Sequence, residues 1–446
     1  MTDFEEMPIE LLAAWPVLVL VLHWFDKRHG RLPLFLSYSY IAGLAINHWF
    51  GALVHSVPAR PFLSSANTIL GFGLATWGLL FFVLGTIVVP NERRARPAQR
   101  TQVGDGAALD FKDGMRVAKV LMIIGAVSFF LEKTWVMTLP SMSATVSGGK
   151  QMLIAGICLN CWLLWQQGRK RSFMQWLVLS LSFPIFTVLT QGFLGFGIAF
   201  LATILIFVGT FYRPRWHIVG GGLAAVFGAL SLFVAYLEHR DNLRAAVWGE
   251  QSAEVRIAAA LDMVLAIEPF DLTKPNHLNA IDLRLNQNEL VGAAMEYVPN
   301  FMEFASGETL YMALISMVPR VLWPDKPVYG GSMGLVTRYT GIVFAENTSV
   351  GIGPVIEFYV NFGWPGVAVG FFVLGSAMRF VDFRLANSLV RRTWPVVGTW
   401  FAIGVALGQP LGQLVEVTGS VAAAAIVGLT IQRYVERRRP QVGRAK

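Results

Sequence analysis

The sequence predicts an all-α polytopic membrane protein with about eleven transmembrane helices. Of its 446 residues, 54% are hydrophobic and only 14% are charged, whereas soluble domains carry about 25% charged residues. Apolar runs of the length that crosses a bilayer, about 20 residues, recur along the chain. Aromatic residues make up 13% and include 14 tryptophans, which is typical of a protein with two interfacial belts.

Eight apolar runs precede one long polar stretch, and three follow it. We expect membrane-spanning helices at Ile9–Phe25, Leu34–Val57, Ala66–Pro90, Val117–Leu139, Gln151–Trp165, Phe173–Thr190, Phe193–Phe211, His217–Leu237, Trp364–Phe380, Val396–Leu411 and Val415–Ile431. The expected organisation is helices 1–8 within residues 1–237, an outer loop over 238–350, helices 9–11 within 351–433 and a basic tail over 434–446.

The formal net charge of +8 is carried by short loops between the spans. A nucleic-acid-binding protein would gather these cations on one soluble face, so we expect no nucleic-acid partner. Basic loops mark the cytoplasmic side of a membrane, and here they alternate with loops that are poor in Lys and Arg. This pattern predicts an outer amino terminus, periplasmic in a bacterial inner membrane, a cytoplasmic carboxyl terminus and an outer location for residues 238–350.

The outer stretch keeps Trp, Tyr, Phe and Leu, a composition that argues against disorder. We expect an amphipathic helix near its start, a second helix over 286–304, and a re-entrant or interfacial half-helix over 309–322, which is too short to span. Asn276–Asn279 is expected to form a turn. The apolar face of the first helix has residues at helical spacing: Ile257, Leu261, Val264 and Leu265.

Several cations in this stretch are candidates for holding an anionic ligand. Arginine offers a planar fork of donors that fits a phosphate, and lysine supplies a mobile point charge. Beside apolar helices, such cations suit an anionic head on a long apolar tail, such as a lipid-linked diphosphate. The alternative for any single cation is snorkelling to the interface or pairing with Asp325. The candidates are Arg320, Lys326, Arg284 and Arg338.

Other residues are candidates for acid–base chemistry and for contacts with a sugar. A carboxylate or an imidazole can take the proton from an attacking hydroxyl; a structural role, capping a helix or pairing an arginine, is the alternative. The seven histidines are scattered, and we expect no metal and no other cofactor. The candidate bases are Glu357, His277 and Glu346, and the candidate sugar contacts are Trp323, Asp325, Tyr359 and Asn361.

Two segments of the chain resemble a known family. Val318–Pro327 and, some thirty residues later, Glu357–Gly366 are similar to the O-antigen polymerase type of bacterial oligosaccharide repeat-unit polymerases. The arrangement of many spans with one large outer loop late in the chain is also similar. The resemblance covers about fifty residues by motif and most of the length by topology.

The resemblance implies a GT-C-like membrane glycosyltransferase at the outer face of the inner membrane. Such enzymes transfer a growing glycan from undecaprenyl diphosphate to the next lipid-linked unit, without a nucleotide sugar or metal, beside a flippase and a chain-length regulator. By motif, Arg320 and Lys326 would hold the diphosphate, Arg284 and Arg338 would be further candidates, and Glu357 is the motif acid. Two alternatives stay open. One is transfer to another acceptor, as in O-antigen ligases. The other is a lipid-glycan flippase or transporter, with Asn47, His48 and the region of Asn160 lining its path.

Overall fold

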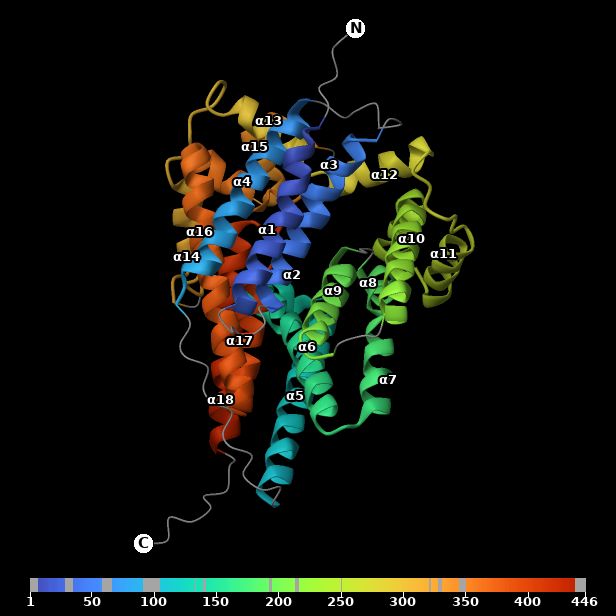
Figure 1. Ribbon diagram of the computed structural model, residues 1–446, viewed down its shortest axis with the longest axis vertical. Coiled ribbons are helices and arrows are strands. Elements are labelled where there is room, and N and C mark those ends of the chain that lie inside the picture. Colours follow the sequence, from blue (N-terminus) through green and yellow to red (C-terminus); the bar gives the residue numbers. More distant parts are fainter. Residues whose placement is uncertain are drawn as a thin grey trace. The chain divides into compact units, whose positions relative to one another are not determined.

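A computed structural model describes the chain over residues 7–28, 35–57, 66–90, 105–132, 134–138, 142–191, 195–212, 216–249, 251–320, 322–327, 331–344 and 350–437. The protein is all-helical, with 81% of its residues in helices and no strand within these ranges (Figure 1). The all-α class predicted from the sequence is therefore confirmed.

The helices divide into two compact units, each assembled from three parts of the chain. Unit 1 comprises Met1–Pro16, Ile41–Thr76 and Arg171–Ala293, and unit 2 comprises Val17–Tyr40, Trp77–Lys170 and Ala294–Lys446. In chain order the elements are α1 (Ile9–Arg28), α2 (Phe35–Leu44), η1 (Ala45–Trp49), α3 (Phe50–His55), α4 (Ala66–Val88), α5 (Asp105–Leu131), η2 (Trp135–Thr138), α6 (Met142–Gln166), α7 (Lys170–Ser180), α8 (Phe183–Gln191), α9 (Gly195–Gly209), α10 (Trp216–Trp248), α11 (Ala253–Leu265), α12 (Pro275–Leu285), α13 (Asn288–Tyr297), α14 (Glu308–Ser316), α15 (Ser332–Thr340), α16 (Gly353–Val390), α17 (Trp394–Leu407) and α18 (Leu414–Arg437).

Six helices of the described chain are long and apolar enough to cross a membrane, which gives the protein transmembrane character. They are Ile9–Arg28, Ala66–Val88, Phe111–Leu131, Lys170–Thr190, Gly353–Val390 and Leu414–Tyr434. Each overlaps a span predicted from the sequence. Two shorter apolar helices, Gly197–Gly209 and Trp394–Leu407, overlap two further predicted spans.

The three other predicted spans are also helical but are not among the six. Residues 35–55 form one continuous run made of α2, the π turn η1 and α3. In α6 the polar side chains of Lys150, Gln151 and Asn160 are buried, and α10 continues past the predicted boundary at residue 237. The count of eleven spans stays a prediction.

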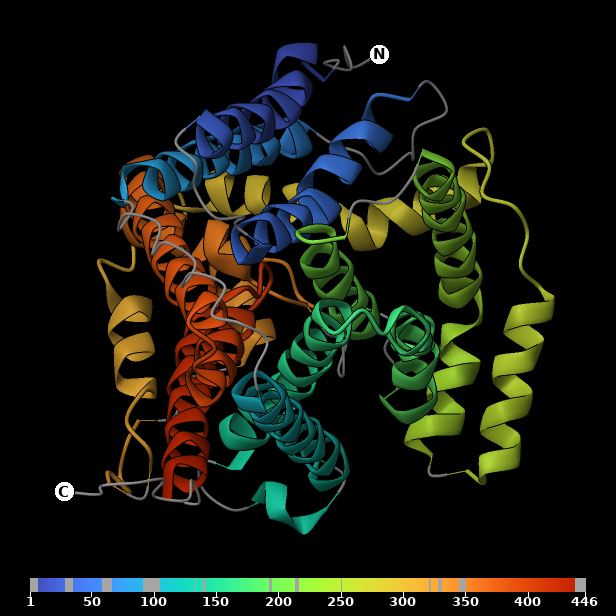
Figure 2. The ribbon, with the colours of Figure 1, turned by 60° about the horizontal axis from the view of Figure 1, so that its bottom comes forward.

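Unit 1 is organised around α10, against which α8, α11 and α12 pack. Figure 2 shows α10 and α11 side by side, in yellow-green. The contact is made by Ala259, Ala260 and the buried Met263 of α11. The predicted amphipathic helix therefore exists. Its predicted apolar face, which runs from Ile257 to Leu265, is exposed and points away from α10.

The turn predicted at Asn276–Asn279 is wrong, because these residues form the first turn of α12. Pro275 occupies the first helical position, where its fixed φ favours a helix and its missing N–H costs nothing. Leu278 and Ile281 then pack against Val54 of α3 in a buried cluster. Tertiary packing and the proline outweigh the turn preference of the asparagines.

Asn288 joins α13 to the π turn within unit 1. Its Nδ2 donates to the His48 carbonyl at 2.8 Å, and its Oδ1 lies 2.8 Å from His48 Nδ1. The Gln287 N–H donates to the Asn47 carbonyl at 2.9 Å. Asn47 and His48, which were considered for a transport path, hold the start of α13.

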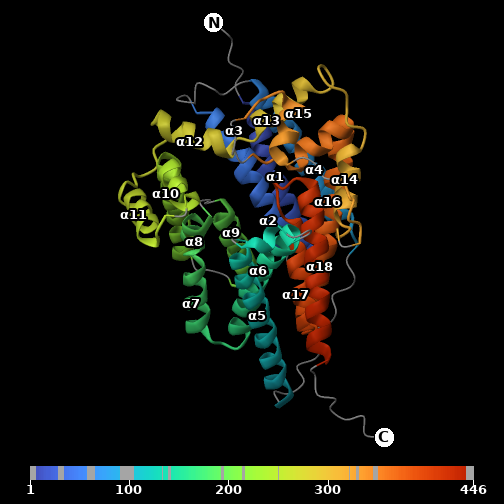
Figure 3. The same ribbon diagram turned by 180° about the vertical axis from the view of Figure 1, so that it is seen from behind.

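In unit 2, α17 packs against α5, α6, α16 and α18, and α14 packs against α16 and α18 (Figures 1 and 3). Phe371, Trp394 and Phe401 are completely buried among these helices. Lipid tails are as apolar as such side chains, so membrane helices associate through close packing rather than through the hydrophobic effect.

α4 and α16 achieve close packing in unit 2 through two glycines. A Cβ on Gly85 would lie 2.2 Å from the Phe372 carbonyl oxygen, and one on Gly375 would lie 2.2 Å from the Phe82 carbonyl oxygen. The Ser376 hydroxyl donates to the Gly85 carbonyl at 3.2 Å. The two backbones therefore touch where neither helix carries a side chain.

Gly85→Ala is expected to lower the free energy of unfolding by about 1–3 kcal/mol, because the added methyl group forces the two backbones apart. Gly73→Ala on the same helix is the control, since no heavy atom lies within 4 Å of its Cβ position. Alanine at residue 73 is expected to be neutral or stabilising by up to about 1 kcal/mol. Unfolding of both variants in detergent measures the difference, and equal stabilities would contradict the contact.

Candidate functional site

The second sequence motif, Glu357–Gly366, bends α16. Phe362 and Gly363 leave helical geometry, with φ angles of −146° and +64°. Gly363 tolerates the positive φ because it has no Cβ. Pro365 adds to the break, since it cannot donate an N–H and its ring crowds the preceding turn. The motif therefore divides α16 into two helical segments.

The segment that leads into α14 forms hydrogen bonds with residues at this bend in α16. The Val360 carbonyl accepts the Ala305 N–H at 2.7 Å, and Asn361 Oδ1 accepts the Gly307 N–H at 2.9 Å. Asn361 Nδ2 donates to the Thr309 hydroxyl at 2.6 Å. Because Asn361 is completely buried, these bonds fix the start of α14.

α14 leads directly into the first motif, Val318–Pro327, and its end is fastened to α18. Thr418 Oγ1 donates to the Ala313 carbonyl at 2.7 Å and lies 2.7 Å from Ser316 Oγ. α14 has nine residues, a length of about 13 Å at the ordinary helical rise. The structure thus places the two motifs at the two ends of one short helix.

Arg320 and Lys326 close the loop of the first motif. Arg320 Nη1 donates to the carbonyls of Lys326 at 2.9 Å and Pro324 at 3.4 Å. Lys326 Nζ donates to the carbonyls of Val318 at 2.9 Å and Ser316 at 3.3 Å. Burial lowers the pKa of the Lys326 ammonium group, and the Arg320 charge lowers it further. Two cations therefore lie in one loop, where main-chain carbonyls orient them.

Apolar side chains are exposed beside these cations. Tyr311 and Leu314 on α14 are 59% and 66% exposed, and Met317 and Leu322 in the adjoining loop are 42% and 77% exposed. Exposed apolar patches mark membrane or ligand contacts. The combination of oriented cations and apolar surface fits a ligand with an anionic head and an apolar tail.

Arg338 is held at the opposite end of α14. Its Nη1 and Nη2 donate to the two carboxylate oxygens of Glu308, each at 3.0 Å. Glu308 is the first residue of α14, whereas the loop with Arg320 and Lys326 follows its last residue. The structure brings Arg320 and Lys326 together and separates Arg338 from them, because the bidentate pair with Glu308 fixes its position.

The four predicted sugar contacts lie in unit 2 and differ in exposure. Trp323 and Asp325 are exposed in the loop of the first motif, so both can meet a ligand as placed. Tyr359 and Asn361 are buried, and the Tyr359 hydroxyl donates to the Val298 carbonyl at 3.2 Å. The second pair positions the segment before α14.

Glu357, the motif acid, is completely buried. One of its carboxylate oxygens accepts the N–H of Leu414, the first residue of α18, where helix N–H groups have no partner within the helix. The other, Oε1, has no hydrogen-bond partner among the described residues. The geometry matches the capping alternative and leaves one oxygen for proton transfer. Glu346, the third candidate base, lies outside the described residues.

Glu357→Gln is expected to keep the stability of the native protein, because an amide oxygen still accepts the Leu414 N–H. Glu357→Leu is expected to lower the free energy of unfolding by about 1–3 kcal/mol, since it leaves that buried N–H without an acceptor. Turnover of the glutamine variant then separates the two roles. A loss of about 100-fold or more at unchanged stability indicates a base, and normal turnover assigns Glu357 to capping alone.

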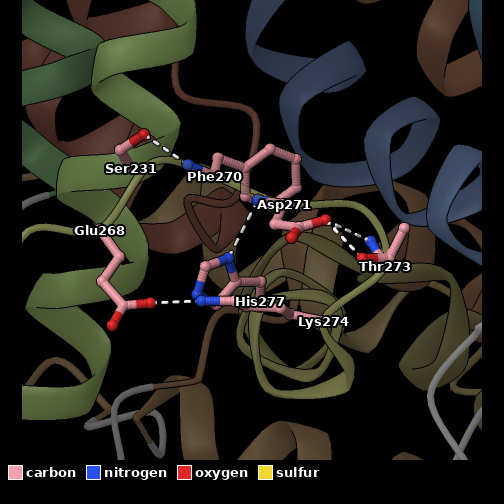
Figure 4. A network of polar contacts seen from close by, with 7 residues as sticks. All are labelled: Ser231, Glu268, Phe270, Asp271, Thr273, Lys274 and His277. Carbon is pink, nitrogen blue, oxygen red and sulfur yellow. Dashed lines mark hydrogen bonds and ion pairs between the residues drawn. The ribbon is translucent and has the colours of Figure 1, made fainter.

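His277 lies in unit 1, buried on α12. Its Nδ1 accepts the Asp271 N–H at 3.0 Å, and its ring stacks on Phe270 with centroids 6.0 Å apart. The Phe270 N–H donates to Ser231 Oγ at 2.8 Å (Figure 4). The hydrogen bond to Nδ1 therefore anchors the connection between α11 and α12. Proton transfer by His277 would then involve Nε2.

Arg284 also belongs to unit 1, whereas Arg320 and Lys326 belong to unit 2. It lines a cleft between α10 and α12. In the ranges covered by the structure, no group of three or more His, Cys, Asp or Glu side chains is placed to hold a metal ion.

A charged cluster that was not predicted lies among the apolar helices of unit 2. Arg379 on α16 has a side chain only 1% exposed, and its Nη1 lies 3.6 Å from Asp26 Oδ1 on α1. Asp382 accepts the Leu36 and Ser37 N–H groups, each at 3.0 Å, and the Ser37 hydroxyl at 2.8 Å. It thereby caps the start of α2. The sequence contains a signal for this cluster, namely an Arg and an Asp three residues apart within an apolar run.

The fold and the site define an all-helical membrane protein in which two motifs converge on one short helix. The chain belongs to the family described as "Domain of unknown function (DUF8712)", whose model matches residues 109–389. The match covers more than half of the 446 residues and includes both motifs. No curated protein and no solved structure matches the chain.

Proposed function

We propose that the protein polymerises undecaprenyl-diphosphate-linked oligosaccharide units into O-antigen or exopolysaccharide. The observation that carries this proposal is the loop at the end of α14, where Arg320 and Lys326 lie beside the exposed Leu314 and Leu322. A guanidinium fork and an ammonium group suit a diphosphate, and the apolar side chains suit a polyprenyl tail. The motifs that meet at this helix are the ones that resemble the polymerase family.

The proposed reaction is glycosyl transfer between two lipid-linked glycans. A hydroxyl oxygen of the acceptor sugar forms a bond to the anomeric carbon of the donor chain. The bond from that carbon to the diphosphate oxygen breaks, and its electron pair leaves with the diphosphate. Arg320 and Lys326 stabilise the charge on this leaving group. The hydroxyl proton goes to a base, for which Glu357 is the candidate in the same unit as Arg320 and Lys326.

The same proposal includes the finer topology and the location. Eleven spans in a GT-C-like arrangement would place the amino terminus and residues 238–350 in the periplasm and the carboxyl terminus in the cytoplasm of a bacterial inner membrane. The alternation of basic loops supports this orientation. A flippase that delivers the units and a chain-length regulator are the proposed partners.

Lipid-linked units isolated from cells that lack the protein provide the test. Purified protein in detergent is expected to convert them into a ladder of longer lipid-linked glycans and to release undecaprenyl diphosphate. Transfer of a finished glycan to an acceptor without this lipid would favour a ligase. Movement of units across vesicle membranes without a change in length would favour a transporter.

A transporter is the second candidate because of one observation. Asp26, Arg379 and Asp382 are buried among apolar helices of unit 2. Ionisable side chains within membrane segments often mark ion or substrate pathways. The vesicle assay distinguishes this function from polymerisation, since a polymerase changes glycan length and a transporter does not.

A further inference from the structure

A cleft of about 330 Å³ opens between α10 and α12 in unit 1. Its volume falls within the range of about 300–1000 Å³ that is usual for small-molecule sites. The polar lining consists of Glu238, Arg240 and Asp241 from α10 and Asn276, Asn279 and Arg284 from α12. None of the motifs that converge on α14 contributes to it.

α12 presents two chemically different faces, and the cleft uses one of them. Asn276, Asn279 and Arg284 share the lining face with Ala280 and Leu283, at the spacing of one side of a helix. The other face is buried, with exposures of 4% for His277, 0% for Leu278 and 2% for Ile281. The buried face determines the orientation of the helix, so the polar face is held toward α10.

Both ends of α12 are anchored in unit 1. At its start, His277 Nδ1 accepts the Asp271 N–H, and Lys274 pairs with Glu268 (Figure 4). Just past its end, Asn286 Nδ2 donates to Asp282 Oδ1 at 2.8 Å and to Thr68 Oγ1 at 3.2 Å. A helix that is held at both ends presents its outer side chains at constant spacing, which is the requirement for a binding site rather than a loose surface.

The charges in the cleft balance. Arg240 Nε lies 3.2 Å from Asp241 Oδ1, and Glu238 and Arg284 are the other two charged residues of the lining. A phosphate would prefer an excess of cations, and a hard cation such as Ca²⁺ would prefer oxygen ligands without guanidinium groups beside them. The lining instead mixes donors from two guanidinium groups, acceptors from two carboxylates and both kinds from two carboxamides.

We infer that this cleft binds a short neutral segment of a saccharide. Each hydroxyl of a sugar both donates and accepts a hydrogen bond, which a balanced lining of amides, carboxylates and guanidinium groups satisfies. Leu237, Ala280 and Leu283 supply apolar surface for the C–H face of a sugar ring. The choice of a saccharide over other hydroxyl-rich ligands rests on the proposed function. Arg284 thereby contacts glycan rather than the diphosphate.

Binding of free oligosaccharides by the full-length protein in detergent tests this inference. The probes are a panel of neutral and N-acetylated tetrasaccharides without lipid, with inorganic phosphate and Ca²⁺ as comparisons, followed by saturation-transfer NMR and titration. At least one neutral oligosaccharide is expected to bind. Asn279→Ala, Arg284→Gln and the cleft-filling Ala280→Phe are each expected to weaken its binding at least tenfold.

Ala258→Phe on α11 and Arg116→Gln on α5 are the matched controls, because both residues lie outside the cleft lining and both are expected to leave binding unchanged. Failure of every oligosaccharide to bind, binding of phosphate or Ca²⁺ instead, or binding that survives Ala280→Phe would overturn the inference. No lipid-linked donor is present in these titrations. Failure of the proposed polymerase function and failure of this binding site therefore give different experimental results.

Discussion

Arg379→Leu is expected to lower the free energy of unfolding by about 3–5 kcal/mol. The substitution removes the cation from a buried cluster and leaves Asp26 as a charge among apolar helices, and breaking a buried ion pair from one side costs about this much. Arg379 and Asp26 have side chains only 1% and 8% exposed, so water cannot compensate the remaining carboxylate. Unfolding of the purified variant in detergent, followed by circular dichroism, measures the loss.

Two further variants test whether the loss of stability comes from the buried ion pair. Arg384→Leu removes an exposed arginine on the same helix, where its guanidinium lies 5.0 Å from the ring of Phe380, and it is expected to cost no more than about 1 kcal/mol. Arg379→Leu combined with Asp26→Leu is expected to recover most of the loss, since apolar replacement of a whole buried pair is often close to neutral. A single Arg379→Leu variant as stable as Arg384→Leu would show that the cluster is hydrated.

The sequence predicted the helices better than their orientation. Apolar spacing at Ile257, Leu261, Val264 and Leu265 correctly indicated a helix, but Ala259, Ala260 and Met263 face α10. In a membrane protein both faces of a helix can be apolar. Periodicity therefore identifies the element and not the neighbour, because lipid and protein attract the same side chains.

The two motifs indicated a candidate site but not how its residues are held together. Gly363 and Pro365 lie at a break in α16, which was not predicted from the sequence. The sequence contains no sign that Asn361 would hold the start of α14, or that Glu308 would bind Arg338. Such contacts join residues 30 to 54 positions apart, and only the folded chain decides which polar group satisfies which partner.

Arg379 and Asp382 are a different case, because two ionisable residues within an apolar run were visible in the sequence but were not predicted to form a cluster. The outer stretch contains many cations, so the sequence predicted an anion site there and not within the spans. An ionisable side chain inside an apolar run is by default a functional or structural centre. Asp382 caps a helix that begins at Phe35, a partner more than three hundred residues earlier that composition alone does not reveal.

Arg320→Ala is expected to lower polymerisation at least 100-fold if the proposed function holds. The loss of one preoriented donor to a developing charge costs about 100- to 1000-fold in turnover, and Arg320 offers a bidentate fork to a diphosphate. Arg320→Lys keeps the charge but not the fork, so it is expected to be intermediate. The rate of chain extension on isolated lipid-linked units, with donor concentration varied, gives kcat and KM for each variant.

Arg320 also donates to the carbonyls of Pro324 and Lys326, so its loss could act through the shape of the loop. Lys326→Gln separates the two effects, because a glutamine amide can still donate to the Val318 carbonyl while the charge is gone. A role in holding the diphosphate requires both substitutions to lower kcat at unchanged thermal stability. If Arg320→Ala lowers only the stability, or if it extends glycans at the rate of the native protein and of the remote control Arg116→Gln, then the loop at the end of α14 does not hold the leaving group.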